Sequence, residues 1–189
     1  TMPESITDKI NRFINEYEIP AYDAEILCQD IELADYFENT AKVSQNSKSS
    51  SNWIMTEVLK QLKHTNTELK DFAVSAEDLG KIIKLIDTNV ISSKIAKTLF
   101  EMKLTDERDP ETIVKEEKMA QVADDGAIEA LVDEVLANNP KLIEDYKNSD
   151  EGRKPRVLKG LIGQAMKLSK GKANPQMVTE LMTKKLAAM

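Results

Sequence analysis

The chain has 189 residues, with 26 basic and 33 acidic side chains and a formal net charge of −7. Its length suits one ordinary domain or two small ones, and 41% apolar residues are too many for a wholly disordered chain. No apolar run approaches the ~20 residues that a membrane-spanning helix needs, so we expect no contact with a membrane.

Apolar residues recur with helical spacing along the N-terminal part of the chain. Their stripe predicts a first helix over residues 6–17, with Ser5 as its N-cap and Pro20 as its stop. A second helical stretch is predicted over residues 22–41. The polar, serine-rich segment 42–52 offers nothing that we expect to be buried, so we predict an exposed loop there.

The middle of the chain continues the helical pattern. One helix is predicted over residues 53–62, and another follows Ser75, which has the character of an N-cap. Ser92 or Ser93 is expected to begin the next helix. The polar segment 105–110 is a candidate junction between two domains.

Prolines mark several helix starts in the C-terminal part. Pro110 and Pro140 are each expected to open a short helix, and the segment 124–138 between them shows a strongly amphipathic pattern. Another helix is predicted over about 155–169, and the pair 174–175 (Asn-Pro) is expected to begin the last one. Since no segment alternates like a strand, the sequence predicts an all-α fold of two small helical subdomains.

The residues that usually carry catalysis are scarce. His64 is the only histidine and lies in a polar stretch, so we interpret it as a surface residue. The only cysteine, Cys28, cannot form an intrachain disulfide, fits a reducing compartment and is interpreted as a packed thiol. No glycine-rich phosphate-binding motif is present. We therefore predict no catalytic residue, no metal ligand and no cofactor site in this chain.

Charge is distributed unevenly along the chain. Residues 1–152 hold 17 basic and 32 acidic side chains, whereas residues 153–189 hold 9 basic and 1 acidic. Seven of those basic residues fall within 153–172, which contains no acidic residue. Such a split suggests that the basic end meets an anionic partner. A solvated basic face that forms ion pairs with the acidic part of the chain is the alternative interpretation.

Helical periodicity gathers the basic residues on one face. Arg156, Lys159, Lys167 and Lys170 fall within an arc of about 80°, and Gly163 lies inside it. A glycine inside a helix costs up to about 1 kcal/mol relative to alanine, so its presence suggests that a partner approaches the bare backbone. The phosphate backbone of a nucleic acid is a suitable partner. Without interleaved aromatic residues, recognition of backbone and shape is favoured over base stacking.

Two short motifs give the C-terminal part a family resemblance. Residues 163–167 read GQAMK and residues 171–175 read GKANP, and the run that contains them resembles the C-terminal end of the B subunit of bacterial aspartyl/glutamyl-tRNA amidotransferase. Upstream segments extend the resemblance over nearly the whole chain: 22–27, 32–38, 51–59, 91–102 and 132–146. Residues 153–159 depart from the family, which more often has a small apolar run there.

The resemblance implies a role within a larger enzyme. That enzyme, an ATP-dependent carbon–nitrogen ligase, converts Glu-tRNA(Gln) and Asp-tRNA(Asn) to Gln-tRNA(Gln) and Asn-tRNA(Asn) with ammonia that its A subunit releases from glutamine. The B subunit uses ATP and Mg²⁺ in an N-terminal cradle domain, which is expected to contact the A and C subunits. This chain is then expected to comprise a linker (1–21), a helical domain (22–107) and a YqeY-like tail (108–189), to be non-catalytic and to be cytoplasmic.

The residues and the resemblance lead to one hypothesis, in which the tail domain docks tRNA. Basic side chains are predicted to contact the phosphates: Arg156, Lys159, Lys167, Lys170 and Lys172. Gly163 and Gly171 are expected to let the RNA backbone approach closely. The alternative is a protein-interaction module whose basic face docks an acidic partner subunit or a synthetase.

Overall fold

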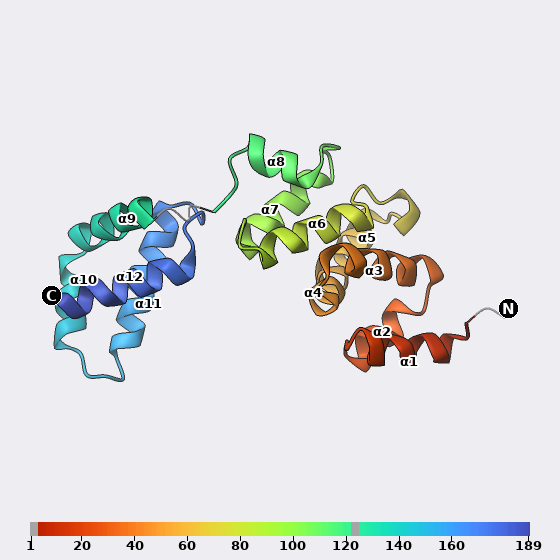
Figure 1. Cartoon of the computed structure of the whole chain (residues 1–189), viewed down its shortest axis with the longest axis horizontal. Coiled ribbons are helices and arrows are strands. Elements are labelled where there is room, and N and C mark those ends of the chain that lie inside the picture. The colour runs from red at the N-terminus through yellow and green to blue at the C-terminus, as the bar shows by residue number, and fades with distance from the viewer. Residues whose placement is uncertain (1–3, 122–124) are drawn as a thin grey trace. The chain divides into compact units, whose positions relative to one another are not determined.

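The computed structural model describes residues 4–121 and 125–189, and every regular element within these ranges is a helix (Figure 1). The predicted all-α fold is therefore confirmed. By their packing, the described residues form two units. The first contains those of 1–88 and 96–118, and the second contains those of 89–95 and 119–189.

The helices of the first unit follow one another with short connections. In chain order they are α1 (Ile6–Glu16), α2 (Ala21–Leu27), α3 (Ile31–Ser44), α4 (Ser47–Trp53), the π-helical turn η1 (Ile54–Val58), α5 (Leu59–Thr65), the 3₁₀ turn η2 (Leu69–Asp71), α6 (Ala76–Asp87), α7 (Ser93–Lys103) and α8 (Pro110–Glu116). The first turn of α7 belongs to the second unit and its remainder to the first.

The second unit contains four helices in its described part. They are α9 (Asp125–Asn138), α10 (Pro140–Asn148), α11 (Lys154–Leu168) and α12 (Pro175–Ala188). The amphipathic pattern over 124–138 is confirmed as α9, apart from residue 124, which lies outside the described residues. No described helix of either unit combines the length and the apolar content that crossing a membrane requires.

Several helix starts form as the sequence predicts. Ser5 and Ser75 each accept a hydrogen bond at 3.1 Å from the backbone N–H three residues ahead. Asn174 accepts from the N–H two residues ahead at 3.0 Å, and Pro110 and Pro140 open their helices. These caps satisfy N–H groups that have no partner within the helix, so local chemistry alone sets these boundaries.

The helical stretch predicted over 22–41 is helical but divided into two helices. The chain leaves α2 after Leu27 and begins α3 at Ile31, because Asp30 takes an extended backbone conformation and accepts the backbone N–H of Glu32 at 2.8 Å. The break allows each helix to present its own apolar face to the core, with Leu27 and Phe37 fully buried. Because the apolar residues keep helical spacing on both sides of Asp30, the pattern alone does not reveal that Asp30 is the N-cap of α3.

The prediction of an exposed loop over 42–52 is wrong. The segment continues α3 to Ser44 and starts α4 at Ser47, and the side chains of Ser50 and Ser51 are buried. The hydroxyl oxygens of Ser44 and Ser50 lie 2.8 Å apart, and Ser51 donates to Asp23 Oδ2 at 2.8 Å. Because each hydroxyl has a partner, these small polar side chains can be buried where helices meet.

The core of the first unit is built around the crossing of α3 and α6. Gly80 on α6 is buried, and a Cβ at this position would lie 2.6 Å from Val43 Cβ on α3. The absence of a side chain therefore lets the two backbones approach closely. Farther along the unit, Trp53 packs against Phe100 with ring centroids 5.9 Å apart.

Helix α8 packs against α6 within the first unit. Ile113 is fully buried there, and the Lys81 ammonium lies 2.5 Å from the Asp109 carboxylate. The sequence-based boundary between residues 107 and 108 would instead assign α8 to the second domain. That boundary stays a prediction about the family's domains, while the packing of this chain groups α8 with the helices before it.

Apolar side chains from α9, α11 and α12 form the core of the second unit, and α10 packs against it. Val132, Leu161, Ala165, Val178 and Met182 are fully buried in this core. Because α11 contributes Leu161 and Ala165, its buried face is fixed, and so is the face that it turns to solvent.

Candidate nucleic-acid interface

The solvent-facing side of α11 carries three of the predicted cations. Arg156, Lys159 and Lys167 are all exposed, whereas Leu161 and Ala165 on the opposite side of the helix are fully buried. The apolar spacing of the helix thus orients the basic side chains outward. The result is a row of positive charge along a rigid element of the second unit.

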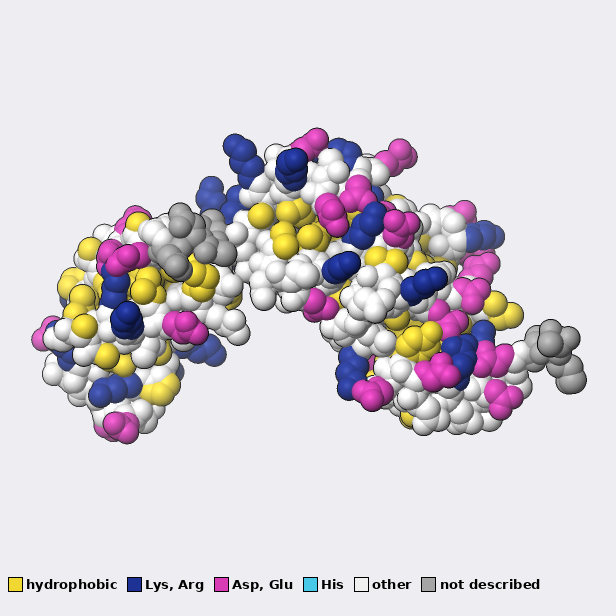
Figure 2. Space-filling model, viewed as in Figure 1, with side chains coloured by type: hydrophobic (Ala, Val, Ile, Leu, Met, Phe, Trp, Pro, Cys, Tyr) yellow, Lys and Arg dark blue, Asp and Glu magenta, His cyan; other side chains and the backbone are white. Residues whose placement is uncertain are grey.

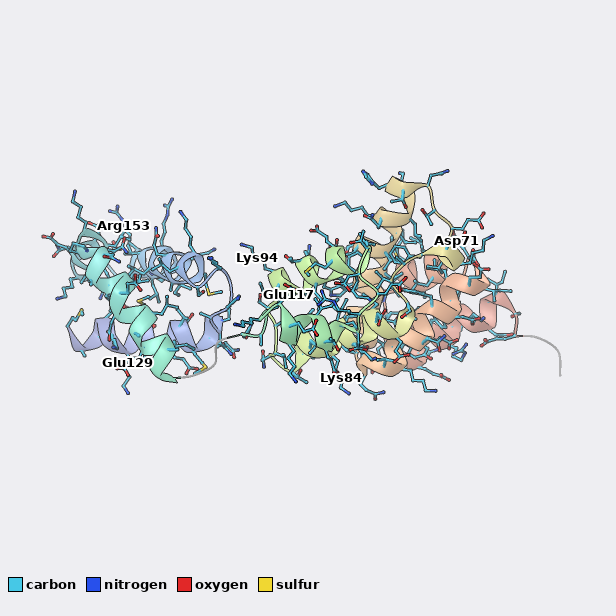
Figure 3. The ribbon with its side chains drawn as sticks, turned by 90° about the horizontal axis from the view of Figure 1, so that it is seen from above. Asp71, Lys84, Lys94, Glu117, Glu129 and Arg153 are labelled. Atoms are coloured by element: carbon cyan, nitrogen blue, oxygen red, sulfur yellow. The ribbon has the colours of Figure 1, made fainter. Side chains whose placement is uncertain are left out.

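None of the five predicted cations has an intramolecular ion pair among the described residues. Arg156, Lys159, Lys167, Lys170 and Lys172 also make no side-chain hydrogen bond there. The ion pairs described in the second unit join a different lysine, on α12, to two carboxylates of α9. In Figure 3, Arg153 at the start of α11 and Glu129 on α9 lie at opposite edges of the unit.

Several cations of the first unit, unlike these five, form ion pairs. On its visible face, basic and acidic side chains are interspersed (Figure 2). Arg12 pairs with both Glu4 and Glu38, which raises the pKa of the guanidinium. Arg108 donates to Asp106, which lowers the pKa of that carboxyl to about 2. The interpretation that the basic face of the second unit serves intramolecular ion pairs therefore finds no support in its described contacts.

The predicted basic arc is wrong at the C-terminal end of α11, where Lys170 does not lie on the helix. The helix ends at Leu168, and Lys170 has a left-handed backbone with φ of 53°. Lys170 N donates to Lys167 O at 3.1 Å and Gly171 N donates to Met166 O at 2.8 Å, which is the hydrogen-bond pattern of a Schellman motif. Lys170 therefore does not continue the helical row; it belongs to the loop that follows.

The two predicted glycines have different surroundings. Gly171 is buried and has φ of 78°, a conformation that side chains rarely adopt, so the turn itself requires it. Gly163 is exposed, and a Cβ added there would meet nothing within 4 Å. Packing within the second unit therefore does not explain why residue 163 is glycine. Its lack of a side chain leaves the helix backbone exposed in the middle of the basic row.

The structure adds a cation that sequence reasoning missed. Ser92 and Lys94 lie in the segment 89–95, which belongs to the second unit. Ser92 Oγ donates to Gly171 O at 3.4 Å, and Lys94 Cδ lies 3.8 Å from the Cβ position of Gly171. The only sequence signal was a lysine next to a predicted helix start, which by itself does not indicate a site.

Other candidate chemistry does not coincide with this surface. His64 is exposed near the end of α5, and Cys28 is buried, as predicted for a packed thiol. Burial raises the pKa of the Cys28 thiol, so it stays protonated and unreactive near neutral pH. Within the described ranges no group of three or more His, Cys, Asp or Glu side chains has an arrangement suited to a metal ion.

A groove in the second unit is separate from the basic row. It has a volume of about 260 Å³ and lies between α9 and α12. Its lining combines apolar side chains with two carboxylates and one lysine: Ile128, Met177, Leu181, Glu129, Glu180 and Lys184. None of the predicted cations lines it, so the basic residues do not form part of this groove.

Comparison with known proteins gives a consistent family. The GatB domain (GatB_Yqey) matches residues 35–186. The chain is 59% identical over 185 residues to the B subunit of the aspartyl/glutamyl-tRNA(Asn/Gln) amidotransferase of Fusobacterium nucleatum. It is 46% identical over 187 residues to the corresponding protein from Chlorobaculum tepidum, and 42% over 189 residues to that from Carboxydothermus hydrogenoformans. These matches cover 98%, 99% and 100% of this chain but 38% of each relative.

Proposed function

The chain belongs to the GatB domain family of amidotransferase B subunits, and from that premise we propose that its second unit docks tRNA. The names of the relatives refer to aspartyl- and glutamyl-tRNA, so the substrate of the parent enzyme is itself an RNA. Docking would hold Glu-tRNA(Gln) or Asp-tRNA(Asn) while the attached amino acid is amidated elsewhere in the enzyme.

The observation that carries this proposal is the set of cations without intramolecular partners. Five basic side chains lie on the exposed side of α11 and in the loop after it, and none forms an ion pair among the described residues. An RNA backbone supplies closely spaced phosphates that could pair with such a row. The segment has no aromatic residue for stacking on bases, which favours recognition of the sugar-phosphate backbone and its shape.

The remaining functions of the parent enzyme are assigned to the rest of the relatives' length. Since the chain spans 38% of those relatives, we infer that ATP, Mg²⁺ and the reacting carboxylate bind outside it. Contacts with the A and C subunits are likewise assigned to that remaining part, the cradle. In this proposal the chain is the non-catalytic RNA-holding part of a cytoplasmic, multi-subunit ligase.

Removing three of the cations is expected to weaken tRNA binding and to reduce its salt dependence. The variant Lys167→Ala/Lys170→Gly/Lys172→Ala removes one helical and two loop cations, and glycine suits residue 170 because its φ is 53°. Each lost phosphate contact should lower the slope of log affinity against log salt by about 0.7–0.9. Titration of labelled tRNA at several salt concentrations measures this slope.

A matched control removes the same charge from the first unit. Lys60, Lys63 and Lys84 are exposed on α5 and α6 and have no ion pair among the described residues. Changing all three to alanine should leave the slope nearly unchanged. If the tail variant keeps the wild-type slope, or if both variants lose affinity equally, the assigned docking surface is wrong.

A nuclease treatment separates tRNA docking from the alternative of a protein-interaction module. If tRNA bridges this chain to its partners, digestion of RNA should release them from the immobilised protein. An acidic partner subunit or a synthetase that stays bound after digestion, and that leaves when the three tail lysines are changed, would favour the alternative.

Replacing Gly163 with alanine is expected to separate stability from binding. The helix should gain up to about 1 kcal/mol, because alanine favours helices and nothing within 4 Å opposes its Cβ. Affinity for tRNA should fall because the new methyl group covers backbone inside the basic row. Urea unfolding followed by far-UV circular dichroism and tRNA titration measure the two effects.

Gly160→Ala is the control for that variant. Gly160 also has nothing within 4 Å of an added Cβ, but it lies beside the basic row and not inside it. It should gain similar stability and lose less affinity. Equal tRNA affinity for wild type and Gly163→Ala would show that no partner approaches the backbone there.

A further inference from the structure

The loop after α11 is in contact with a segment from another part of the chain. Residues 89–95 comprise the end of the connection from α6 and the first turn of α7, and they belong to the second unit together with that loop. The hydroxyl of Ser92 donates to Gly171 O at 3.4 Å, and the Lys94 stem lies 3.8 Å from the Cβ position of Gly171. Because Lys170 and Lys172 flank Gly171 in sequence, Lys94 brings a third cation to this loop.

No described carboxylate neutralises this cluster of three lysines. Lys94, Lys170 and Lys172 have neither an ion pair nor a side-chain hydrogen bond among the described residues. Lys94 also stands in the first turn of α7, where the helix dipole disfavours a cation. Local helix stability therefore does not explain Lys94, whereas an anion bound from outside would pair with these cations.

We propose that Lys94 is a further phosphate-contacting residue, and that the tRNA-docking surface extends from the tail onto the 89–95 segment. This inference rests on the proposed function, since it assigns a new residue to the same surface. The ligand is the sugar-phosphate backbone of a folded RNA. Two chain segments that are distant in sequence then supply the cations of one cluster, Lys94 from one and Lys170 and Lys172 from the other.

The surface so defined has two parts. The row on α11 offers Arg156, Lys159 and Lys167. The cluster beyond the end of that helix offers Lys94 from the start of α7 and the two loop lysines, Lys170 and Lys172. A row with a cluster beyond its end presents positive charge in two parts, which can contact the phosphates of a folded RNA at more than one place.

The test compares single substitutions in the whole chain. Lys94→Ala is expected to lower the slope of log tRNA affinity against log salt by about 0.7–0.9, as expected for Lys170→Gly. Lys94→Arg should keep the wild-type slope, because it preserves the charge. Lys84 is exposed on α6 and has no ion pair among the described residues, so Lys84→Ala is the matched control and should also keep the slope. Circular dichroism checks that each variant stays folded.

The outcomes separate this inference from the proposal on which it rests. A lower slope for both Lys94→Ala and Lys170→Gly, with Lys94→Arg unchanged, supports the extended surface. A normal slope for Lys94→Ala beside a lower one for Lys170→Gly overturns the role of Lys94 and leaves tail docking in place. Wild-type slopes for both variants overturn docking at this loop altogether. If Lys84→Ala lowers the salt slope as much as Lys94→Ala does, the assignment of Lys94 is overturned, because removing any exposed lysine would then have the same effect on tRNA binding.

Discussion

Changing Lys103 to methionine is expected to destabilise the first unit by about 3 kcal/mol. The Lys103 side chain is 3% exposed, and its ammonium lies 3.2 Å from Asp78 Oδ2 and 2.8 Å from the carbonyl oxygen of Arg108. Methionine would fill similar space but would leave both oxygens without their donor. This loss is at the lower end of the range expected for a broken buried ion pair, because Asp78 is 20% exposed and can be partly hydrated.

Lys97→Met is the matched control for that substitution. Lys97 is on the same helix and pairs with Glu57 at 3.0 Å, but its side chain is 62% exposed. An exposed pair of this kind contributes about 0–1 kcal/mol. Trp53, the only tryptophan, is buried in the first unit, so its fluorescence during urea unfolding reports on this unit. Equal losses in the two variants would show that burial of Lys103 has no special role.

Replacing Gly80 with alanine is expected to destabilise the first unit by about 1–3 kcal/mol. The new Cβ would lie 2.6 Å from Val43 Cβ, 2.8 Å from Val43 Cγ1 and 3.0 Å from the Thr40 carbonyl oxygen. The nearest atoms belong to the base of a side chain and to backbone, so α3 and α6 must move apart. That repulsion exceeds the gain of up to about 1 kcal/mol that alanine gives an unobstructed helix.

Gly160→Ala tests the same substitution in open space. Nothing lies within 4 Å of its Cβ, so this variant should be more stable than wild type. The two substitutions are chemically identical and both lie in helices, yet they should have opposite effects on the free energy of unfolding: Gly80→Ala lowers it and Gly160→Ala raises it. The first is measured by Trp53 fluorescence and the second by far-UV circular dichroism. Stabilisation by Gly80→Ala would show that the close approach of α3 and α6 is absent in solution.

Much of the fold was predictable because helix starts depend on nearby residues. Ser5, Ser75 and Asn174 act as N-caps in the structure as their sequence context predicts, and Pro110 and Pro140 open helices. A cap requires only a side-chain oxygen and a backbone N–H two or three residues ahead. Such local interactions are present in the sequence before any tertiary contact forms.

A distant partner can bury a polar side chain that its local sequence context would place at the surface. The serine-rich segment is helical and partly buried because Asp23, in α2, accepts the hydroxyl of Ser51. Lys103 is buried because Asp78 and the Arg108 carbonyl meet it, although lysine is usually exposed. Polarity alone predicts exposure for both residues, because it contains no information on which partner the fold will supply.

Parts of the candidate site were also predictable from local sequence, while other parts depended on the structure. Spacing alone predicted that Arg156, Lys159 and Lys167 share one face of a helix, and the structure places them on the exposed side of α11. Spacing placed Lys170 on the same face, but the helix ends first and the residue turns into the loop. Whether these residues bind phosphate stays a prediction that the salt dependence of tRNA binding will test.

The sequence by itself determined the all-α class, most helix starts and the side of α11 that carries positive charge, because these depend on short-range hydrogen bonds and on a fixed helical period. The tertiary structure decided which polar residues are buried, why Gly80 must lack a side chain, and that Lys94 lies beside the loop at Gly171. Those facts depend on contacts between residues far apart in the chain, and only packing brings them together.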